Sequence, residues 1–347
     1  MSRAASLFDL QIPPAQIAQQ PLTERDHSRL MVVKRGRPGI SHHRFDDLPA
    51  LLPPGCLMIR NNTRVIPARL QGELSSGRAI EVLLTGEEAP GRWEALVKGA
   101  RKVKPGERIA FAGGALLARA AERGPEGTWR LEFDEPGLVR ERLWQFGLAP
   151  LPPYVKRNGH AAQHRDWYQT CYARVEGSIA APTAGFHFTP ALFAALEARG
   201  IGCMEITLHV GVGTFQSIEN HDLGRHRMHR EWYEVPQQTC RAIHDARERG
   251  RPVIGVGTTT VRALESWSRE GAPEGCAGYT ELFIRPPFEF GVIDGLITNF
   301  HQPASTLIQL VAALHGEDLI LAAYEEAIAQ RYRFFSYGDA MCILPRP

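Results

Sequence analysis

Short apolar runs that end in polar residues open the chain. Arg29–Arg35 (RLMVVKR) and Gly55–Asn62 (GCLMIRNN) both follow this pattern. Apolar runs of this length, bounded by turn-forming residues, are typical of strands in a protein core. The pattern therefore predicts two core strands within residues 1–63.

The pattern changes between residues 64 and 150. Here apolar and polar residues alternate in the short runs AIEVLL, WEALVK, RIAFA and WRLEF, which are separated by turns that contain glycine or proline. Such alternation is typical of a small antiparallel barrel or sandwich. A short amphipathic helix, Leu138–Phe146, closes the segment, with Gly147 as its stop and the stiff LPPY sequence after it.

From residue 151 onward, helical and strand patterns alternate. Thr189 and Pro190 suit a helix N-cap and first turn, and Gly200 stands where that helix should end. The strand-like IGCMEITLHV follows, and the alternation returns in PQQTCRAIHDARERG, PVIGV, TTVRALESW and YTELFI. This order favours an α/β domain with a substantially parallel sheet.

Core-strand patterns precede the alternating segment and resume after it, which indicates an insertion. We therefore expect residues 1–63 and 151–347 to form a large mixed α/β sheet domain. Residues 64–150 should form a small antiparallel β-barrel domain inserted into it.

Composition excludes several classes of protein. Among the 347 residues, 44% are hydrophobic and 22% charged, and no stretch approaches the roughly 20 apolar residues of a membrane span. The first residues resemble neither a secretory signal nor a transit peptide, and the six cysteines form no CxxC pair. We expect a cytoplasmic protein with reduced thiols, without a membrane partner or a zinc ribbon.

The net charge of +2 is too small to indicate a nucleic-acid partner, so local clusters carry that argument. Between Lys98 and Arg108 the cations outnumber the single acid, Glu107. The cluster consists of Lys98, Arg101, Lys102, Lys104 and Arg108. On a small barrel it is suited to a phosphate backbone, and a solvated hairpin is an equally good interpretation.

Two segments join a strand end to glycines and hydroxyl groups. In Val253–Ser266 (VIGVGTTTVRALES) a hydroxyl-bearing turn opens a helix, whose free backbone N–H groups suit a carboxylate or phosphate. Ordinary helix capping explains the same residues equally well. Leu208–Phe215 (LHVGVGTF) lacks the third glycine of a dinucleotide fingerprint.

Histidines and acidic residues gather at the expected strand ends and turns. The histidines are His187, His209, His226, His229 and His301. This placement suits proton transfer or polar substrate contacts. A metal site at His226, His229 and Glu231 is a weaker alternative, because the spacing matches no known signature, and we predict no metal.

Two further acids have distinct surroundings. Asp339 follows a run of aromatic and cationic residues that suits a nucleobase, although the same run suits closure of a C-terminal core. Glu265 lies one helical turn after Arg262, so an ion pair on the helix surface is the simplest expectation for it.

Nine sequence blocks, in the same order, resemble the S-adenosylmethionine:tRNA ribosyltransferase-isomerase family. They are IAQQPLTERDHSRLMVV, NNTRVIPARL, LPPYVKR, YQTCYARVEGSIAAPTAGFHFT, TLHVGVGTF, MHREWYEV, GVGTTTVRALES, LITNFHQPAST and YRFFSYGDAM. They span nearly the whole chain. Departures are Asn62 where Asp is frequent, Val212 between two glycines, and Gln302 where an apolar residue is usual. If Asn62 replaces a contacting carboxylate, an acid role at that position is void.

The resemblance implies a large α/β domain with an inserted β-barrel. It also implies that the ribosyl portion of S-adenosylmethionine is transferred to 7-aminomethyl-7-deazaguanine at the wobble position of tRNA, giving epoxyqueuosine and releasing adenine and methionine. S-adenosylmethionine is consumed as a cosubstrate, with no metal or flavin. We expect the enzyme to act on tRNA as a monomer.

Such a reaction needs several proton transfers in one pocket. The candidates for them are His187, His209, His229 and Glu231, followed by His301 and Asp339. Candidates for binding the methionine carboxylate or a tRNA phosphate are Thr258, Thr259, Thr260 and Arg262. Gly211 and Gly213 should allow close backbone approach, and Phe186, Phe188 and Tyr337 are candidates for stacking on a base.

Two other functions fit parts of the sequence. The glycine turns are compatible with a Rossmann-like S-adenosylmethionine-dependent RNA methyltransferase, which releases S-adenosylhomocysteine. The barrel is compatible with a non-catalytic tRNA-binding protein, which binds tRNA without turnover.

Overall fold

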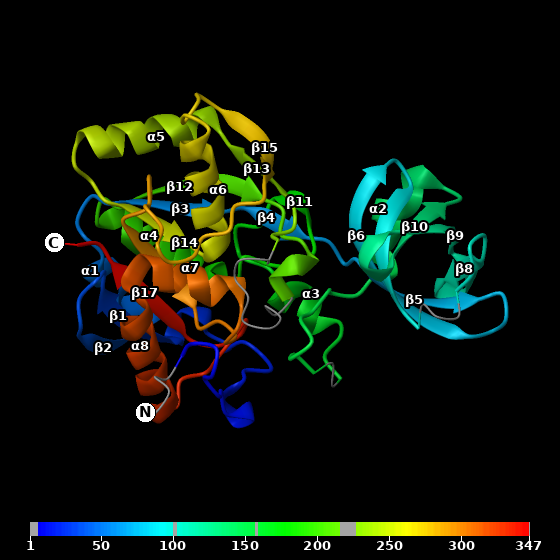
Figure 1. The fold of residues 1–347 in the computed structure, drawn as a ribbon, viewed down its shortest axis with the longest axis horizontal. Coiled ribbons are helices and arrows are strands. Elements are labelled where there is room, and N and C mark those ends of the chain that lie inside the picture. The colour runs from blue at the N-terminus through cyan, green and yellow to red at the C-terminus, as the bar shows by residue number, and fades with distance from the viewer. Residues whose placement is uncertain (1–5, 100–102, 157–158, 216–226, 347) are drawn as a thin grey trace.

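A computed structural model describes residues 6–99, 103–156, 159–215 and 227–346. The chain forms a large α/β domain and a separate β-barrel beside it (Figure 1). A nine-stranded mixed sheet and a closed six-stranded antiparallel barrel are the centres of the two parts. The predicted fold class, a mixed α/β domain with an inserted barrel, is therefore confirmed.

The large sheet has parallel strands at its centre and antiparallel strands toward its edges. Its spatial order is β15 (Cys276–Thr280), β13 (Glu231–Val235), β12 (Gly202–Leu208), β3 (Leu57–Asn61), β14 (Val253–Val256), β16 (Gly295–Asn299), β17 (Ala340–Leu344), β1 (Arg29–Lys34) and β2 (Ile40–Arg44). Strands β12, β3, β14 and β16 run parallel, as do β17 and β1. The other neighbours are antiparallel, so the sheet is less parallel than the alternating pattern suggested.

Helices cover both faces of this sheet, which explains why its central strands are almost wholly apolar. In β1, Met31 and Val33 belong to one hydrophobic cluster, and Leu30 and Val32 belong to the cluster on the other face. The helices of the domain are α1 (Leu48–Leu51), α3 (Gln163–Trp167), α4 (Pro190–Ala198), α5 (Gln237–Glu248), α6 (Thr258–Arg269), α7 (Thr306–His315) and α8 (Glu317–Ala329). As the sequence indicated, Thr189 caps α4, its hydroxyl accepting from the Leu192 amide at 3.1 Å.

The barrel has a hydrophobic core of its own. Its strands, in spatial order, are β10 (Thr128–Phe133), β7 (Arg92–Lys98), β6 (Ala79–Ala89), β5 (Arg69–Leu74), β8 (Arg108–Phe111) and β9 (Leu116–Arg123). Trp93, Trp129 and Phe111 fill its interior, and helix α2 (Val139–Phe146) packs on it through Val139 and Leu143. All the buried residues of this core except Ile179 lie between Ile66 and Leu143, so the barrel has a core distinct from that of the α/β domain.

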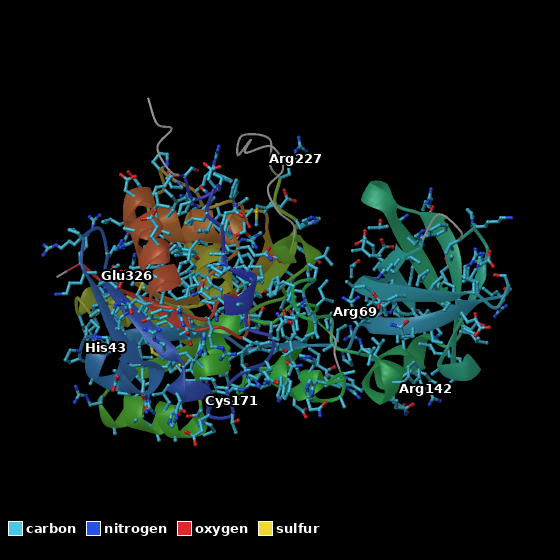
Figure 2. All side chains as sticks on the ribbon, turned by 90° about the horizontal axis from the view of Figure 1, so that it is seen from below. His43, Arg69, Arg142, Cys171, Arg227 and Glu326 are labelled. Carbon is cyan, nitrogen blue, oxygen red and sulfur yellow. The ribbon has the colours of Figure 1, made fainter. Side chains whose placement is uncertain are left out.

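Two chain segments run side by side between the domains. Strand β4 (Thr63–Val65) leads toward the barrel, and β11 (Val175–Ser178) pairs with it in parallel after the chain has returned. Arg69 lies on the side of the barrel that faces the α/β domain (Figure 2), and its backbone pairs with Leu148. Its guanidinium donates to Glu81 at 2.6 Å and to the Leu151 carbonyl at 3.3 Å, so one residue joins the barrel to the returning segment.

Among the described residues, no single helix is long and apolar enough to cross a membrane. The bent pair α7 and α8, whose axes differ by 113°, passes that test of length and composition only when the two helices are taken together.

Candidate active site

A cleft opens at the carboxyl ends of β14 and β16, where ligands bind in many open α/β sheets. It encloses about 660 Å³ of space not filled by atoms, part of it open to solvent. Gly257, Thr258 and Thr259 form one wall after β14, and Asn299 and His301 form another after β16. The remaining walls come from Tyr154, Tyr168, Ala180–Ala184, Phe335 and Ser336.

Helix α6 points its N-terminus into this cleft. Gly257 has a positive φ of 86°, a conformation that glycine adopts freely, and this lets the chain turn from β14 directly into α6. None of the described side chains caps the helix, and its first residues Thr258 and Thr259 line the cleft. Their backbone N–H groups and the positive end of the helix dipole therefore face the cleft.

The predicted threonine cluster divides between two environments. The Thr259 hydroxyl lines the cleft and accepts a hydrogen bond from Asn61 Nδ2 at 3.2 Å. The Thr260 hydroxyl instead donates to the Val256 carbonyl at 2.7 Å, inside the core. Thr258 and Thr259 are thus placed to meet a ligand, and Thr260 supports the turn.

A second, more polar pocket adjoins the cleft, with which it shares Thr259 and Leu307. It holds about 360 Å³ of empty space and is lined also by Gly213, Met228, His229, Glu231, Arg262 and Thr306. Here Arg262 donates from Nη1 to Glu231 Oε2, and the Gly211 amide donates to Glu231 Oε1 at 2.7 Å. The pocket therefore offers a buried cation and a buried carboxylate side by side.

The two predicted glycines make room for these side chains. A β-carbon on Gly213 would lie 2.3 Å from Cδ2 of His229, far inside van der Waals contact. Gly211 brings its amide to Glu231, as described above. The sequence predicted that the backbone at these glycines comes close to a neighbouring group. In the structure the neighbouring groups are the side chains of two other predicted site residues, His229 and Glu231.

His301 lies in the cleft with its ring held in place. Its Nε2 is 2.7 Å from the Thr298 hydroxyl, and its backbone amide donates to the Tyr324 hydroxyl. Burial lowers the pKa of His301 to about 3, so its imidazole is neutral near neutral pH.

His187 and Asp339 lie behind the cleft wall. Nδ1 of His187 is 2.7 Å from the Ser28 hydroxyl, and its Nε2 is 3.2 Å from Nδ2 of Asn299, a residue that does line the cleft. Burial, and secondarily the charges of Arg25 and Arg333, lower the pKa of His187 to about 3. His187 is therefore a neutral ring fixed in the protein interior.

The carboxylate of Asp339 accepts from the backbone amides of Arg29 at 3.1 Å and Arg333 at 2.8 Å. Burial raises its pKa. Oδ1 thus ties this last turn of the chain to β1 and Oδ2 closes the turn itself, and Asp339 is not among the residues that line the cleft.

His209 lies apart from both pockets. Its Nδ1 is 2.9 Å from the Thr63 hydroxyl, and its ring stacks on Trp232 at 5.0 Å between centroids. Burial, with a smaller effect of Arg140, lowers its pKa to about 4. Gly177 passes so close to the ring that a β-carbon there would lie 2.6 Å from Nε2.

The three aromatic candidates do not form a single platform. Phe186 and Tyr337 stack on each other at 5.9 Å and line a small pocket with Arg25 and Ser28. Phe188 is 2% exposed and packs against Phe45 and Phe193 in the core.

Glu265 is not on the helix surface, and the expected pair with Arg262 is wrong. Its side chain is 1% exposed and accepts from the amides of Gly291, Val292 and Ile293 at 2.7–3.0 Å. The spacing within α6 is as predicted, but both residues face the interior, where long-range partners replace the local one.

Some predicted features fall on residues outside those described, namely His226 of the alternative metal site and Arg101 and Lys102 of the basic cluster. Within the described ranges, no group of three or more His, Cys, Asp or Glu side chains is arranged to hold a metal ion. Lys98 and Lys104 of the cluster are described and exposed on the barrel.

Sequence reasoning missed several residues of the cleft, namely Tyr154, Tyr168, Asn299 and Ser336. Tyr154 lies in the LPPY segment, where the sequence pattern indicates a stiff linker and the resemblance assigns no binding residue. Asn299 ends an apolar run and stands at the carboxyl end of its strand, a position that favours functional side chains and is visible in the sequence.

Comparison with known proteins gives matches along nearly the whole chain. A family described as "Queuosine biosynthesis protein" matches residues 5–343. Proteins named S-adenosylmethionine:tRNA ribosyltransferase-isomerase from Pelotomaculum thermopropionicum and Thermotoga maritima are 48% and 46% identical, covering 97% and 98% of this chain and 98% and 99% of theirs. A crystal structure of S-adenosylmethionine tRNA ribosyltransferase from Thermotoga maritima is 39% identical, with a TM-score of 0.57, over 98% of this chain and 100% of that one.

Proposed function

Because this chain belongs to the queuosine biosynthesis protein family, we propose that it is an S-adenosylmethionine:tRNA ribosyltransferase-isomerase. The family membership confirms the resemblance seen in the nine sequence blocks. The observation that carries the activity is an identity of 44–48% to relatives of that name, over nearly the full length of both chains. The proposed acceptor is tRNA with 7-aminomethyl-7-deazaguanine at the wobble position.

The two adjoining pockets suit the two ends of S-adenosylmethionine. We place the methionine part in the pocket of Glu231 and Arg262. There the buried Arg262 guanidinium binds the carboxylate of the methionine part, and the buried Glu231 carboxylate binds its ammonium group. Nη2 of Arg262 is buried without a hydrogen-bond partner among the described residues, so it is a donor available to the methionine carboxylate. The adenosine then extends past Thr259 into the cleft, whose lining is uncharged.

His229 is the proposed base. The sulfonium of S-adenosylmethionine acidifies the ribose C5′ hydrogens, and a base beside the methionine pocket takes one of these protons. His229 lines that pocket and is only partly buried, so its ring can reach a ligand. Glu231, with both oxygens engaged, holds the ammonium group and Arg262 in position.

The other candidates take supporting roles in this proposal. His301, which is neutral in the cleft, is a hydrogen-bond partner for the departing adenine and is too weak a base to hold a proton at neutral pH. His187, His209 and Asp339 lie outside the two pockets and hold the surrounding chain in place. The reaction in this proposal needs no cofactor besides the consumed cosubstrate.

The barrel is the proposed second contact for tRNA. Lys98 and Lys104 are exposed on it and are suited to the phosphate backbone. The α/β domain carries the chemistry, and the two domains together hold one tRNA per monomer in the cytoplasm.

The test is to incubate the protein with S-adenosylmethionine and tRNA that contains 7-aminomethyl-7-deazaguanine. We expect release of adenine and methionine in equal amounts and a nucleoside with the mass of epoxyqueuosine, with neither product from unmodified tRNA. Formation of S-adenosylhomocysteine would instead identify a methyltransferase. Tight tRNA binding without any small-molecule product would identify a binding protein.

A further inference from the structure

Asn299 ends strand β16 at the cleft wall and is 2% exposed. Its Nδ2 donates two hydrogen bonds, to Nε2 of His187 and to the Phe335 carbonyl, both at 3.2 Å. Its Oδ1 is buried and has no hydrogen-bond partner among the residues that the structure describes. Among the described residues that line the cleft, Asn299 is the one with a buried side-chain polar atom lacking a hydrogen bond.

These contacts fix which way the amide faces. The Phe335 carbonyl can only accept, so the NH₂ group of Asn299 must point toward it. The contact with His187 agrees with this orientation, because a neutral ring with its proton on Nδ1, the atom beside the Ser28 hydroxyl, offers Nε2 as an acceptor for the Asn299 amide. Phe45, stacked on the imidazole at 4.8 Å, holds the ring in place.

An unpaired buried acceptor is costly, and native proteins rarely keep one without a purpose. Several other polar side chains of the cleft already have partners inside the protein. The Tyr154 hydroxyl meets Ser336 at 2.7 Å, Ser305 caps α7, and His301 meets Thr298. A ligand with an N–H donor would therefore find its unsatisfied acceptor at Asn299.

We infer that Oδ1 of Asn299 accepts a hydrogen bond from the exocyclic amine of the adenine of S-adenosylmethionine, and that His187 is a positioning residue that holds the Asn299 amide in this orientation. The inference rests on the proposed function, which places the methionine part in the neighbouring pocket and hence the adenine in the cleft. Adenine carries a donor at this position and hypoxanthine does not, so the contact selects the adenine nucleoside.

The experiment measures binding by calorimetry without tRNA. The ligands are S-adenosylmethionine and the analogue that carries purine in place of adenine, which lacks the exocyclic amine. Wild-type protein should bind S-adenosylmethionine about 10-fold more tightly, the effect of one buried hydrogen bond. Asn299→Ala should bind the two ligands with affinities within about twofold of each other, because the variant lacks the oxygen that accepts from the exocyclic amine.

Two substitutions of His187 test the positioning role. His187→Gln keeps an acceptor for the Asn299 amide and should retain most of the selectivity, whereas His187→Leu should lose most of it. Asn62→Ala is the matched control, since Asn62 is buried but bonds to Glu205 and Thr207 away from the cleft. Asn62→Ala should prefer S-adenosylmethionine over the purine analogue by the same factor as the wild type.

The wild-type comparison stands even if a variant fails to fold. Equal wild-type affinity for both ligands, or undiminished selectivity in folded Asn299→Ala, would overturn the inference alone. Loss of tRNA turnover in Asn299→Ala with unchanged selectivity would assign Oδ1 to the RNA base and also overturn it. A wild-type protein that binds neither ligand and releases no adenine would overturn the proposed function itself.

Discussion

Glu231 and Arg262 form an ion pair in the interior of the molecule, although 31 residues separate them along the chain. Their side chains are 4% and 5% exposed. The pair joins the second strand from the sheet edge, β13, to the helix whose N-terminus faces the cleft. Each charge depends on the other, because neither is compensated by water.

Arg262→Met should therefore destabilise the protein by about 3–5 kcal/mol, since it leaves the Glu231 carboxylate buried without its cation. Adding Glu231→Gln should recover part of that loss by removing the stranded charge. Urea unfolding of the single and double variants measures both effects. Losses that simply add would show that the pair is not coupled in the folded protein.

Buried histidines should make stability dependent on pH. Burial lowers the pKa of His301 from 6.5 to about 3. Between these two pH values the unfolded chain therefore binds a proton at this histidine and the folded chain does not. The stabilising contribution is therefore complete above about pH 6.5 and is lost as the pH falls toward 3. His301→Gln should make the free energy of unfolding fall less steeply, by about 1.4 kcal/mol per pH unit between pH 6 and 4. Parallel unfolding curves for variant and wild type across that range would contradict this.

Gly213→Ala should impair turnover more than stability. The added β-carbon would displace the His229 ring, and a misplacement of about 1 Å at a catalytic group costs roughly 10²-fold in rate. Single-turnover kinetics at saturating S-adenosylmethionine measure the effect. Gly86→Ala on β6 is the control, because nothing lies within 4 Å of its added carbon. A normal rate in Gly213→Ala would remove His229 from the proposed chemistry.

Replacing Lys98 and Lys104 together with alanine should weaken tRNA binding without changing the affinity for S-adenosylmethionine. Each phosphate contact that is lost releases about one fewer counterion, so the log–log salt slope should flatten by about one to two units. Filter binding between 50 and 200 mM salt, roughly the range over which such contacts are resolved, provides the measurement. An unchanged slope would place the tRNA surface elsewhere.

Local signals in the sequence predicted the fold class well. The alternating runs between residues 64 and 150 gave the barrel strands, because side chains that alternate along a strand must alternate between core and solvent. The start of α6 could also be predicted from local sequence. The positive φ of Gly257 and the free N–H groups of the first helical turn both depend only on neighbouring residues.

Partners distant in the chain were beyond the reach of the same reasoning. Spacing within α6 suggested that Glu265 pairs with Arg262, but the tertiary fold buries both and gives them partners from the loop at Gly291 and from β13. His187 was a candidate because it is a histidine in an expected turn, and Asp339 because it follows a run of aromatic and cationic residues. Their hydrogen bonds to Ser28, Asn299 and Arg29 join residues that are 112 to 310 positions apart and have no local signature.

Strand β17, near the end of the chain, lies inside the sheet between β16 and β1. The strands at the beginning of the chain, β1 and β2, are joined to the rest of the sheet through it. During synthesis on the ribosome, the contiguous barrel can fold as soon as it emerges, whereas the sheet stays divided until the C-terminal segment is released. Phe335 and Ser336, which close the cleft, arrive with that same segment. A nascent chain that still lacks Phe335 and Ser336 therefore has no complete cleft and cannot consume the cosubstrate.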